Sequence, residues 1–397
     1  MLAALACAVI GLGPQAAAAG EKRAPRAQAK APDKRSGPAA RRCRTRRARK
    51  RSTRRARCRA SRSPARRTDR RPAPLFGFND NAVRAGRIGA EANAQLTQRA
   101  GANITRLTFD WRWVEPQRGN RRFQAYDDIY RAMRARGIRP LLILMFAPSW
   151  ALDPAVGCNQ WAQDCRYPPA REHYPAWRSI AAELARRYPD AAGIEVWNEP
   201  NSSIFWRSGP DPARYTELLA ETYRAVKAVA PTMPVVSGGL ADARNVPGIG
   251  ISLASFLKGM YLNGAAPFMD GIGIHPYPYT LDSGPGSRLQ QNMKTYRYVR
   301  DYFGDKGKPF WATEIGLSSS NATPSLRLTD EQQATGLLSA YRALAGMADV
   351  RAVVVHELLQ SGGDPGQVNS GWGVVRPDLT PRRAFCVLAR ERGRNSC

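Results

Sequence analysis

Short apolar runs alternate with amphipathic segments along most of this chain, from about residue 74 onward. Eight runs are rich in β-branched or aromatic residues and are bounded by Gly, Pro or polar residues, which is typical of buried strands. The predicted strands are residues 75–78, 104–109, 140–146, 193–197, 234–237, 271–274, 309–314 and 350–355. Eight alternating strand and helix units predict an α/β fold, specifically a (β/α)8 TIM barrel.

The segments between the predicted strands carry ordinary helix signals. Asp211 and Pro212 provide a cap and a first turn before apolar residues at helical spacing. Gly137 is expected to end an earlier helix. The rival fold is an open doubly wound sheet, but residues 76–81, which follow the first strand, hold a single glycine. A Gly-rich phosphate loop is therefore absent from this position, and the barrel is favoured.

The first 20 residues have a different pattern. They carry no charge, and an apolar stretch at residues 2–12 leads into the alanine-rich residues 16–20. This arrangement predicts a secretory signal peptide, although no Lys or Arg precedes the apolar stretch. The stretch is too short to span a bilayer, so membrane insertion is not expected. A secreted or cell-surface location follows as the expectation.

Residues 21–72 hold 23 Lys and Arg against three acids, with no aromatic or large aliphatic residue. A segment of this composition cannot build a core and is predicted to be a disordered linker. It supplies +20 of the formal net charge of +29. Such a run attracts polyanions, for example an anionic cell-wall polymer or nucleic acid. The alternative is a solvated linker without a specific partner.

Cysteine usage agrees with export. Beyond the predicted signal peptide, six cysteines form three pairs close in sequence, and the pairs expected to form disulfides are Cys158 with Cys165 and Cys386 with Cys397. A zinc site is disfavoured, because no cysteine pair has the required two-residue spacing and the three histidines lie far apart. Residues 356–360 resemble a zincin helix, but Gln360 replaces the second histidine. No metal and no cofactor are expected.

Two glutamates end predicted strands. Glu199 closes the apolar run at residues 194–197 and is followed by Pro200, whereas Glu314 closes residues 309–314 and precedes a glycine by two positions. Carboxylates at the strand ends of a parallel barrel point into the mouth where substrates bind. Two facing carboxylates are the minimum machinery for cleaving a glycosidic bond. The pattern therefore predicts a glycosidase acting on a polysaccharide or oligosaccharide.

The sequence Trp-Asn-Glu-Pro at residues 197–200, together with Thr-Glu at 313–314, resembles the retaining glycoside hydrolases of clan A. The likeness covers roughly residues 74–390 and is shared by family 39 and by family 5 cellulase-like enzymes. It implies that Glu199 is the acid/base, that Asn198 holds the sugar 2-hydroxyl, and that Glu314 is the nucleophile. These roles correspond to a double-displacement mechanism.

Further positions extend the resemblance. His275 and Tyr277 are similar to a His-x-Tyr pair whose tyrosine hydrogen-bonds the nucleophile, and Arg106 is similar to the arginine beneath it. Residues 110–123 and 373–381 look more like family 39 and its bacterial exopolysaccharide-cleaving relatives. One departure concerns the eighth strand, which usually presents a tryptophan as a sugar platform. The corresponding segment here has none.

Charge considerations assign the same roles. Glu314 is expected to stay ionised beside Arg106 and Tyr277, while Glu199, close to another carboxylate, is expected to carry the proton. Glu195 faces the same side of its strand as Glu199 but one layer deeper, so we expect it to pair with Arg106 inside the barrel.

Tryptophans are candidates for stacking on sugar rings, whose C–H faces are apolar. Those that follow strands or lie in loops are Trp111, Trp150, Trp206 and Trp372, whereas Trp177 and Trp311 are expected in the core.

The sequence thus predicts a signal peptide (1–20), a basic linker (21–72) and a monomeric catalytic barrel (73–397). The competing function is a catalytically inactive carbohydrate-binding barrel, tethered to anionic cell-surface polymer by the basic linker. The presence of both glutamates argues against it. Nucleic acid is a poorer partner, because the linker lacks aromatic residues for base stacking. The sugar, the linkage and the choice between internal and terminal cleavage stay open.

Overall fold

The computed structural model describes residues 73–158, 165–319, 328–361 and 371–397. The predicted signal peptide, the basic linker and the cysteines Cys43 and Cys58 lie outside the described residues.

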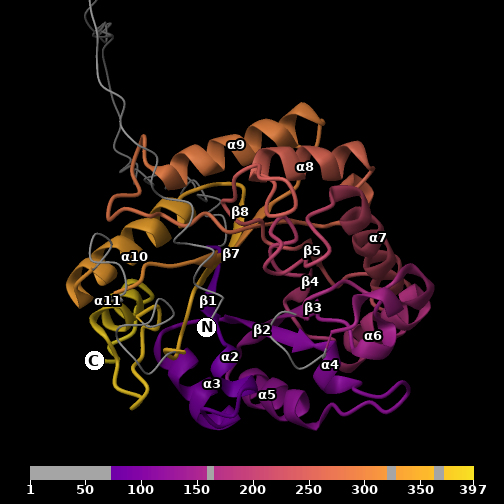
Figure 1. The fold of residues 1–397 in the computed structure, drawn as a ribbon. Helices are drawn as coiled ribbons and strands as arrows, with labels where there is room; N and C mark the ends of the chain where they lie inside the picture. The colour runs from indigo at the N-terminus through magenta and orange to yellow at the C-terminus, as the bar shows by residue number, and fades with distance from the viewer. Residues whose placement is uncertain (1–72, 159–164, 320–327, 362–370) are drawn as a thin grey trace, which may run out of the picture. The chain divides into compact units, whose positions relative to one another are not determined.

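Eight parallel strands form the barrel at the centre of Figure 1. They are β1 (Leu75–Asn79), β2 (Ile104–Asp110), β3 (Arg139–Met145), β4 (Gly193–Val196), β5 (Val235–Ser237), β6 (Ile272–Ile274), β7 (Phe310–Ile315) and β8 (Val350–Val355). Their hydrogen-bonded order is β5-β4-β3-β2-β1-β8-β7-β6. Parallel bridges from Val236 to Gly271 and from Leu240 to Ile274 connect the two ends of this sheet. The predicted barrel is confirmed, with each strand boundary within one residue of its expected position.

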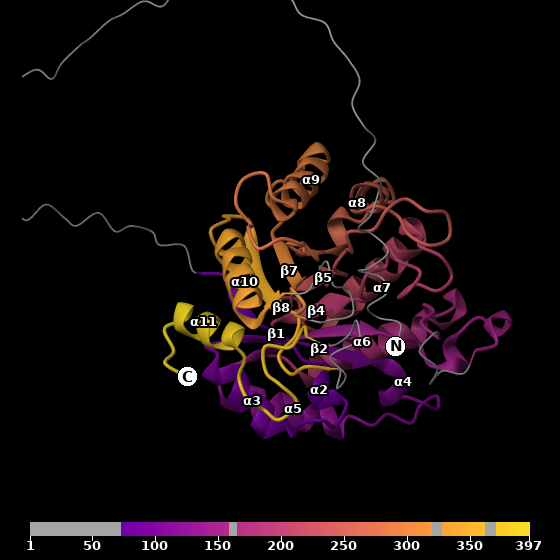
Figure 2. The same cartoon turned by 60° about the vertical axis from the view of Figure 1, so that its left-hand side comes forward.

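Helices surround the strands, as Figures 1 and 2 show from two sides. They are α2 (Asn81–Arg84), α3 (Ala90–Arg99), α4 (Trp111–Val114), α5 (Gln124–Ala135), α6 (Tyr174–Arg187), α7 (Pro212–Val229), α8 (Leu253–Leu262), α9 (Arg288–Tyr302), α10 (Asp330–Ala345) and α11 (Arg383–Glu391). Short 3-10 turns occur at η1 (Ser149–Ala151), η2 (Pro154–Val156), η3 (Arg171–His173) and η4 (Ala266–Phe268). None of the helices described is long and apolar enough to cross a membrane.

The structure contains both the helix-start signal and the helix-end signal that the sequence predicted. The Asp211 side chain accepts hydrogen bonds from the backbone N–H groups of Ala213 and Arg214, which caps α7. Gly137 follows α5 with a φ of +71°, the left-handed conformation that ends a helix without a Cβ clash.

The strands are buried on both faces, as expected for a barrel covered by helices. The lower interior is filled by a separate apolar cluster of Ile104, Leu141, Ala192, Val236, Trp311, Ala352 and Val354. Trp311 and Trp177 are 4% and 0% exposed, which confirms both as core residues. A Cβ on Gly271 would lie 2.4 Å from the Trp311 indole nitrogen, so only glycine leaves room for this ring. The filled interior leaves the carboxyl ends of the strands as the place for a site.

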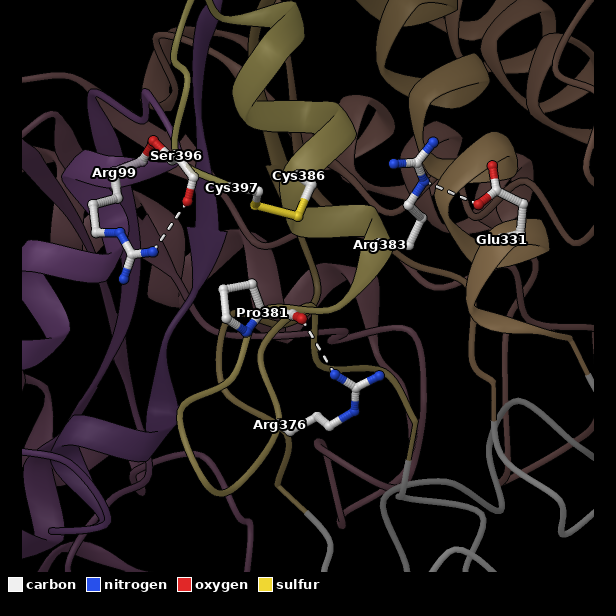
Figure 3. The surroundings of a disulfide bond; sticks show 8 residues. All are labelled: Arg99, Glu331, Arg376, Pro381, Arg383, Cys386, Ser396 and Cys397. Atoms are coloured by element: carbon white, nitrogen blue, oxygen red, sulfur yellow. Dashed lines mark hydrogen bonds and ion pairs between the residues drawn. A yellow bond between two sulfur atoms is a disulfide. The ribbon is translucent and has the colours of Figure 1, made fainter.

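Both predicted disulfides in the described residues are present, Cys158–Cys165 and Cys386–Cys397. Figure 3 shows the second, which ties α11 to the last residue of the chain. Beside it, the Arg99 guanidinium donates to the Ser396 carbonyl over 3.1 Å, and the Ser396 hydroxyl donates back to the Arg99 carbonyl. These bonds join the C-terminal segment to the end of α3.

Candidate active site

Glu199 and Glu314 meet at the carboxyl ends of β4 and β7. One oxygen of each carboxyl group and His275 Nδ1 lie within 4.8 Å of one another. The two carboxyl side chains are only slightly open to solvent, 13% for Glu199 and 11% for Glu314. The structure therefore brings together the two glutamates that the sequence singled out.

The backbone after β4 takes an unusual course to place Glu199. Trp197 has a φ of +69° and Glu199 a φ of +43°, both in the left-handed region that side chains other than glycine rarely adopt. The Glu199 N–H donates to the Gly239 carbonyl over 3.0 Å, which ties this turn to the segment after β5. Strain of this kind is retained where the surroundings impose it, most often at functional sites.

Three donors hold the Glu314 carboxyl group. Arg106, from β2, forms an ion pair with Oε1, and the Asn79 side-chain amide, from β1, donates to the same oxygen over 2.9 Å. The Tyr277 hydroxyl, which lies three residues beyond β6, donates to Oε2 over 2.8 Å. Both oxygens are thus fixed by groups that favour the ionised form.

Arg106 is itself held by a second carboxylate beneath the site. It is completely buried, and its Nε and Nη2 donate to Glu195 over 2.6 and 3.0 Å. Its Nη2 also donates to the Asn198 side-chain oxygen over 2.8 Å. Glu195 accepts further hydrogen bonds from the Gly239 N–H and the Thr313 hydroxyl, each over 3.0 Å. The predicted interior pair of Arg106 and Glu195 is confirmed, and it fixes the guanidinium between Glu314 and Asn198.

Electrostatics favour an ionised Glu314. Burial alone would raise the pKa of this carboxyl group, but the charges of His275, Arg106 and His356, together with the Tyr277 hydrogen bond, hold it well below its usual range. Glu314 is therefore a carboxylate at neutral pH.

His275 connects the two glutamates. Its Nδ1 shares a hydrogen bond of 2.9 Å with Glu199 Oε1 and lies 3.8 Å from Glu314 Oε2. The ring is 1% exposed and packs against the Gly239 backbone, where a Cβ would lie 2.1 Å from Nε2. The imidazole is thus fixed in orientation and, through it, so is Glu199.

The donor types of Glu199, His275 and Glu314 are also those that bind metal ions. In this structure, however, protein partners already use the relevant atoms. Both Glu314 oxygens accept hydrogen bonds, and His275 Nδ1 is bonded to Glu199. A cation here would also face the Arg106 guanidinium, so the arrangement is better suited to acid–base and nucleophilic chemistry than to metal binding.

Two residues of the site were missed in the sequence. Asn79 bonds Glu314, and its side-chain amide also lies 3.1 Å from His356 Nδ1. Asn79 is the last residue of β1, and His356 directly follows β8. This was the same signal that identified Glu199 and Glu314, and it would have found Asn79 and His356 had it been applied to polar residues other than acids.

Among the candidate tryptophans, the structure brings Trp372 to the site. Its ring lies edge-on to Tyr277 and to His356, with centroid distances of 5.7 Å in both cases. The eighth strand has no tryptophan of its own, as the sequence showed, but the Trp372 ring packs against the residue that follows this strand.

The other candidates lie elsewhere. Trp111 and Trp206 are 0% exposed, so neither offers a free face to a sugar ring. The Trp111 indole N–H donates to the Glu115 carboxylate over 2.8 Å, and the ring packs edge-on against Trp150 and Trp177. Trp150 is half-buried, and its indole N–H donates to the Glu115 carbonyl over 3.0 Å. Trp111 therefore belongs to the packed surroundings of the site, and a sugar contact by Trp150 stays a prediction.

Comparison with known proteins gives a family match. Residues 107–335 match the family described as Glycosyl hydrolases family 39. A segment of 129 residues is 29% identical to the β-xylosidase of Geobacillus stearothermophilus. This segment is 30% of the present chain and 25% of that relative.

Solved structures with the same fold include a family 39 glycoside hydrolase from Bacteroides cellulosilyticus, with a TM-score of 0.61 and 23% identity. The likeness covers 81% of this chain and 64% of that one. A family 39 β-xylosidase from Caulobacter crescentus has a TM-score of 0.59 and 20% identity. This likeness covers 82% of the present chain and 73% of the Caulobacter chain. At these identities the structural likeness establishes the barrel fold.

Proposed function

The chain belongs to glycosyl hydrolase family 39, whose match covers more than half of its residues, and from this premise we propose that it is a secreted, retaining glycosidase. It hydrolyses O-glycosidic bonds of a polysaccharide or oligosaccharide by double displacement. The observation that carries this proposal is the pair of carboxyl groups whose oxygens approach within 4.8 Å. Retaining enzymes place the two groups about 5 Å apart, whereas inverting enzymes keep about 6.5–9.5 Å to admit a water between them.

In the first step, a Glu314 carboxylate oxygen attacks the anomeric carbon while Glu199 donates its proton to the departing oxygen. A covalent glycosyl–enzyme ester forms, and the leaving group departs as an alcohol. In the second step, Glu199, now ionised, removes a proton from water, which attacks the anomeric carbon and releases Glu314. Each of the two steps inverts the configuration at the anomeric carbon, so the product keeps the configuration of the substrate.

The remaining residues position these groups. Arg106 and Tyr277 keep the nucleophile ionised and oriented, since they donate to opposite oxygens of Glu314. His275 orients Glu199 through its Nδ1. Asn198, held by Arg106, is placed to bond the 2-hydroxyl of the sugar, as the family resemblance implies.

The known relatives suggest which substrates to test first. The relative with 29% identity over 129 residues is a β-xylosidase, so we propose a β-linked sugar and take β-xylosides as the first substrates to examine. Export is supported by the N-terminal apolar pattern and by the two disulfides. The basic residues 21–72 are proposed to hold the enzyme on anionic cell-wall polymer.

The proposal is tested with the purified protein, the Glu314→Gln variant and the Glu199→Ala variant on a panel of aryl β-glycosides. Glu314→Gln is expected to lose essentially all turnover, because the amide cannot form the intermediate, while the nearly isosteric change keeps the fold. Glu199→Ala should retain activity on activated aryl glycosides, which need no proton to depart, and azide should raise its rate.

Glu314→Gln activity within tenfold of the parent enzyme would refute the nucleophile assignment. A parent protein that binds oligosaccharides but hydrolyses none of the panel would instead favour the inactive carbohydrate-binding barrel.

A further inference from the structure

Tyr279 lies two residues beyond Tyr277, in the segment that leads from β6 to α9. Its ring is tilted by 37° against that of Tyr277, with the centroids 6.2 Å apart, and the residue is 39% exposed. Tyr277 in turn donates to Glu314. A single aromatic ring, that of Tyr277, therefore lies between Tyr279 and Glu314, the proposed nucleophile.

From this position we propose that Tyr279 forms a binding subsite for the sugar ring adjoining the one that is cleaved. The inference rests on the glycosidase function proposed above and deepens it. It identifies the preferred substrate as an oligosaccharide or polysaccharide with at least two linked rings.

The backbone of Tyr279 supplies an independent observation. Its φ is +55°, in the left-handed region that is unfavourable for an aromatic residue and open to glycine. Of the four other described non-glycine residues with positive φ, Phe146, Trp197 and Glu199 follow β3 and β4 at the same end of the barrel, and Leu379 lies between β8 and α11. An aromatic side chain is thus retained at a position where glycine would be less strained, which points to a use for the ring.

The chain on either side of Tyr279 is restrained. Pro276 and Pro278 fix their own φ angles and restrict the residues before them to extended conformations. Downstream, the Thr280 hydroxyl donates to the Asp282 carbonyl over 2.8 Å, and the Ser283 N–H donates to the Ser339 hydroxyl on α10 over 3.2 Å. The backbone around Tyr279 is therefore restrained before any ligand binds, which lowers the entropy cost of ordering this segment on binding.

Among the described residues, Tyr279 is also the exposed member of a row of aromatic rings. From the end of β8, the row runs from His356 through Trp372 and Tyr277 to Tyr279, with successive centroids 5.7, 5.7 and 6.2 Å apart. The cleaved sugar must lie against Glu314, beside the middle of this row. The row extends one ring further at Tyr279, and aromatic faces stack well on the apolar C–H faces of pyranose rings.

Exposed tyrosines elsewhere show that exposure alone would not carry this inference. Tyr298 and Tyr302 on α9 are each 71% exposed, but they lie on an ordinary helix with no positive φ. They serve as matched controls.

The test compares Tyr279→Gly, Tyr279→Phe and Tyr298→Ala in the full-length enzyme. Each variant is assayed on a β-glycosyl fluoride, which has one sugar ring, and on the di-, tri- and tetrasaccharides of the same sugar. We expect Tyr279→Gly to lower kcat/KM on the oligosaccharides about tenfold more than on the fluoride, mainly through KM. Tyr279→Phe should preserve the parent ratio because it keeps the ring, and Tyr298→Ala should leave both activities unchanged.

The glycine variant separates binding from folding, since it relieves the backbone strain and should unfold at or above the parent temperature. An unchanged ratio of oligosaccharide to fluoride activity in Tyr279→Gly would overturn the subsite. Equal losses on both substrates would overturn it as well, because they would show that Tyr279 acts through Tyr277 on the reaction itself. Absence of activity in the parent enzyme on every substrate would refute the proposed function instead.

Discussion

Two chemically identical side chains, Glu199 and Glu314, sit at corresponding strand ends but have different neighbours. Glu314 is surrounded by donors and positive charge, whereas the Glu199 carboxyl group shares a hydrogen bond with the His275 imidazole. The pKa of Glu314 is held well below its usual range in spite of burial. This asymmetry is what a nucleophile and an acid/base require, since one must stay ionised while the other exchanges a proton.

The role of Tyr277 can be tested through pH dependence. Its hydroxyl lowers the Glu314 pKa, so Tyr277→Phe should raise that pKa. Because the proposed nucleophile must be ionised to attack, activity should be lost as the pH falls through this pKa. The acidic limb of kcat/KM should therefore move to higher pH. The measurement is kcat/KM between pH 3 and 8, with Tyr298→Phe as control. A lower kcat/KM with an unmoved acidic limb would contradict this role.

At the residue scale, sequence reasoning found the two carboxyl groups that the structure brings together, but not all of their surroundings. Glu199 and Glu314 stood out because an acid that ends a buried apolar run is rarely structural. Asn79 and His356 escaped because the strand-end signal was applied to acids alone, since neutral or weakly basic residues after strands are common. In the structure, the Asn79 side-chain amide bonds Glu314 and lies 3.1 Å from His356 Nδ1. Trp111 was misplaced because spacing along the chain does not show whether an indole packs inward or outward.

At the scale of elements, the strands were predictable because each is a short apolar run with clear stops. Closure of the barrel was expected from the count of eight strands, but the contacts that produce this closure were not predictable. Closure depends on the three-residue strands β5 and β6, whose approach is closest at Gly273, where a Cβ would lie 2.1 Å from the Ser237 carbonyl oxygen. The Ser237 hydroxyl accepts from the Gly273 N–H over 3.0 Å. Contacts of this kind join residues far apart in sequence and leave no local pattern.

The Cys386–Cys397 disulfide should stabilise the last helix rather than the chemistry. It closes a loop of sequence separation 11 and ties the C-terminal segment to α11. Cys386→Ser should lower the free energy of unfolding by about 2–4 kcal/mol, because a cross-link of this length restricts the unfolded chain. Turnover of the folded enzyme should be unchanged. Denaturant unfolding measures the loss, and Ser396→Ala, which removes one hydroxyl contact and keeps the disulfide, should cost about 1 kcal/mol or less. Equal stability of Cys386→Ser and the parent would refute the stabilising role.

At the scale of the whole molecule, most of the net charge and the proposed catalytic groups are expected to lie in different regions of the chain. Residues 21–72 carry +20 of the net charge, and the remaining +9 belongs to residues 73–397. The described groups of the site all come from the second part. Binding to anionic polymer and hydrolysis should therefore be separable.

Removal of residues 21–72 should leave kcat/KM on a neutral aryl glycoside unchanged. Sedimentation with anionic cell-wall polymer should decrease, most clearly at low salt, because the Debye length falls from about 30 Å at 0.01 M to about 10 Å at 0.1 M. A variant that keeps these residues but replaces half of the arginines with glutamine should bind at an intermediate level. Loss of activity on the neutral substrate by a folded truncated enzyme would show that the basic segment contributes to the site.

Double displacement by Glu314 and Glu199 requires that the first product keep the anomeric configuration of the substrate, and this configuration can be observed as the product forms. The proton NMR spectrum of the sugar released from an aryl β-glycoside is followed from the earliest minutes, before mutarotation mixes the anomers. The spacing of the two carboxyl groups, with oxygens within 4.8 Å, predicts that the β-anomer appears first. Initial appearance of the α-anomer would show single displacement by water and would contradict the assignment of Glu314 as the nucleophile.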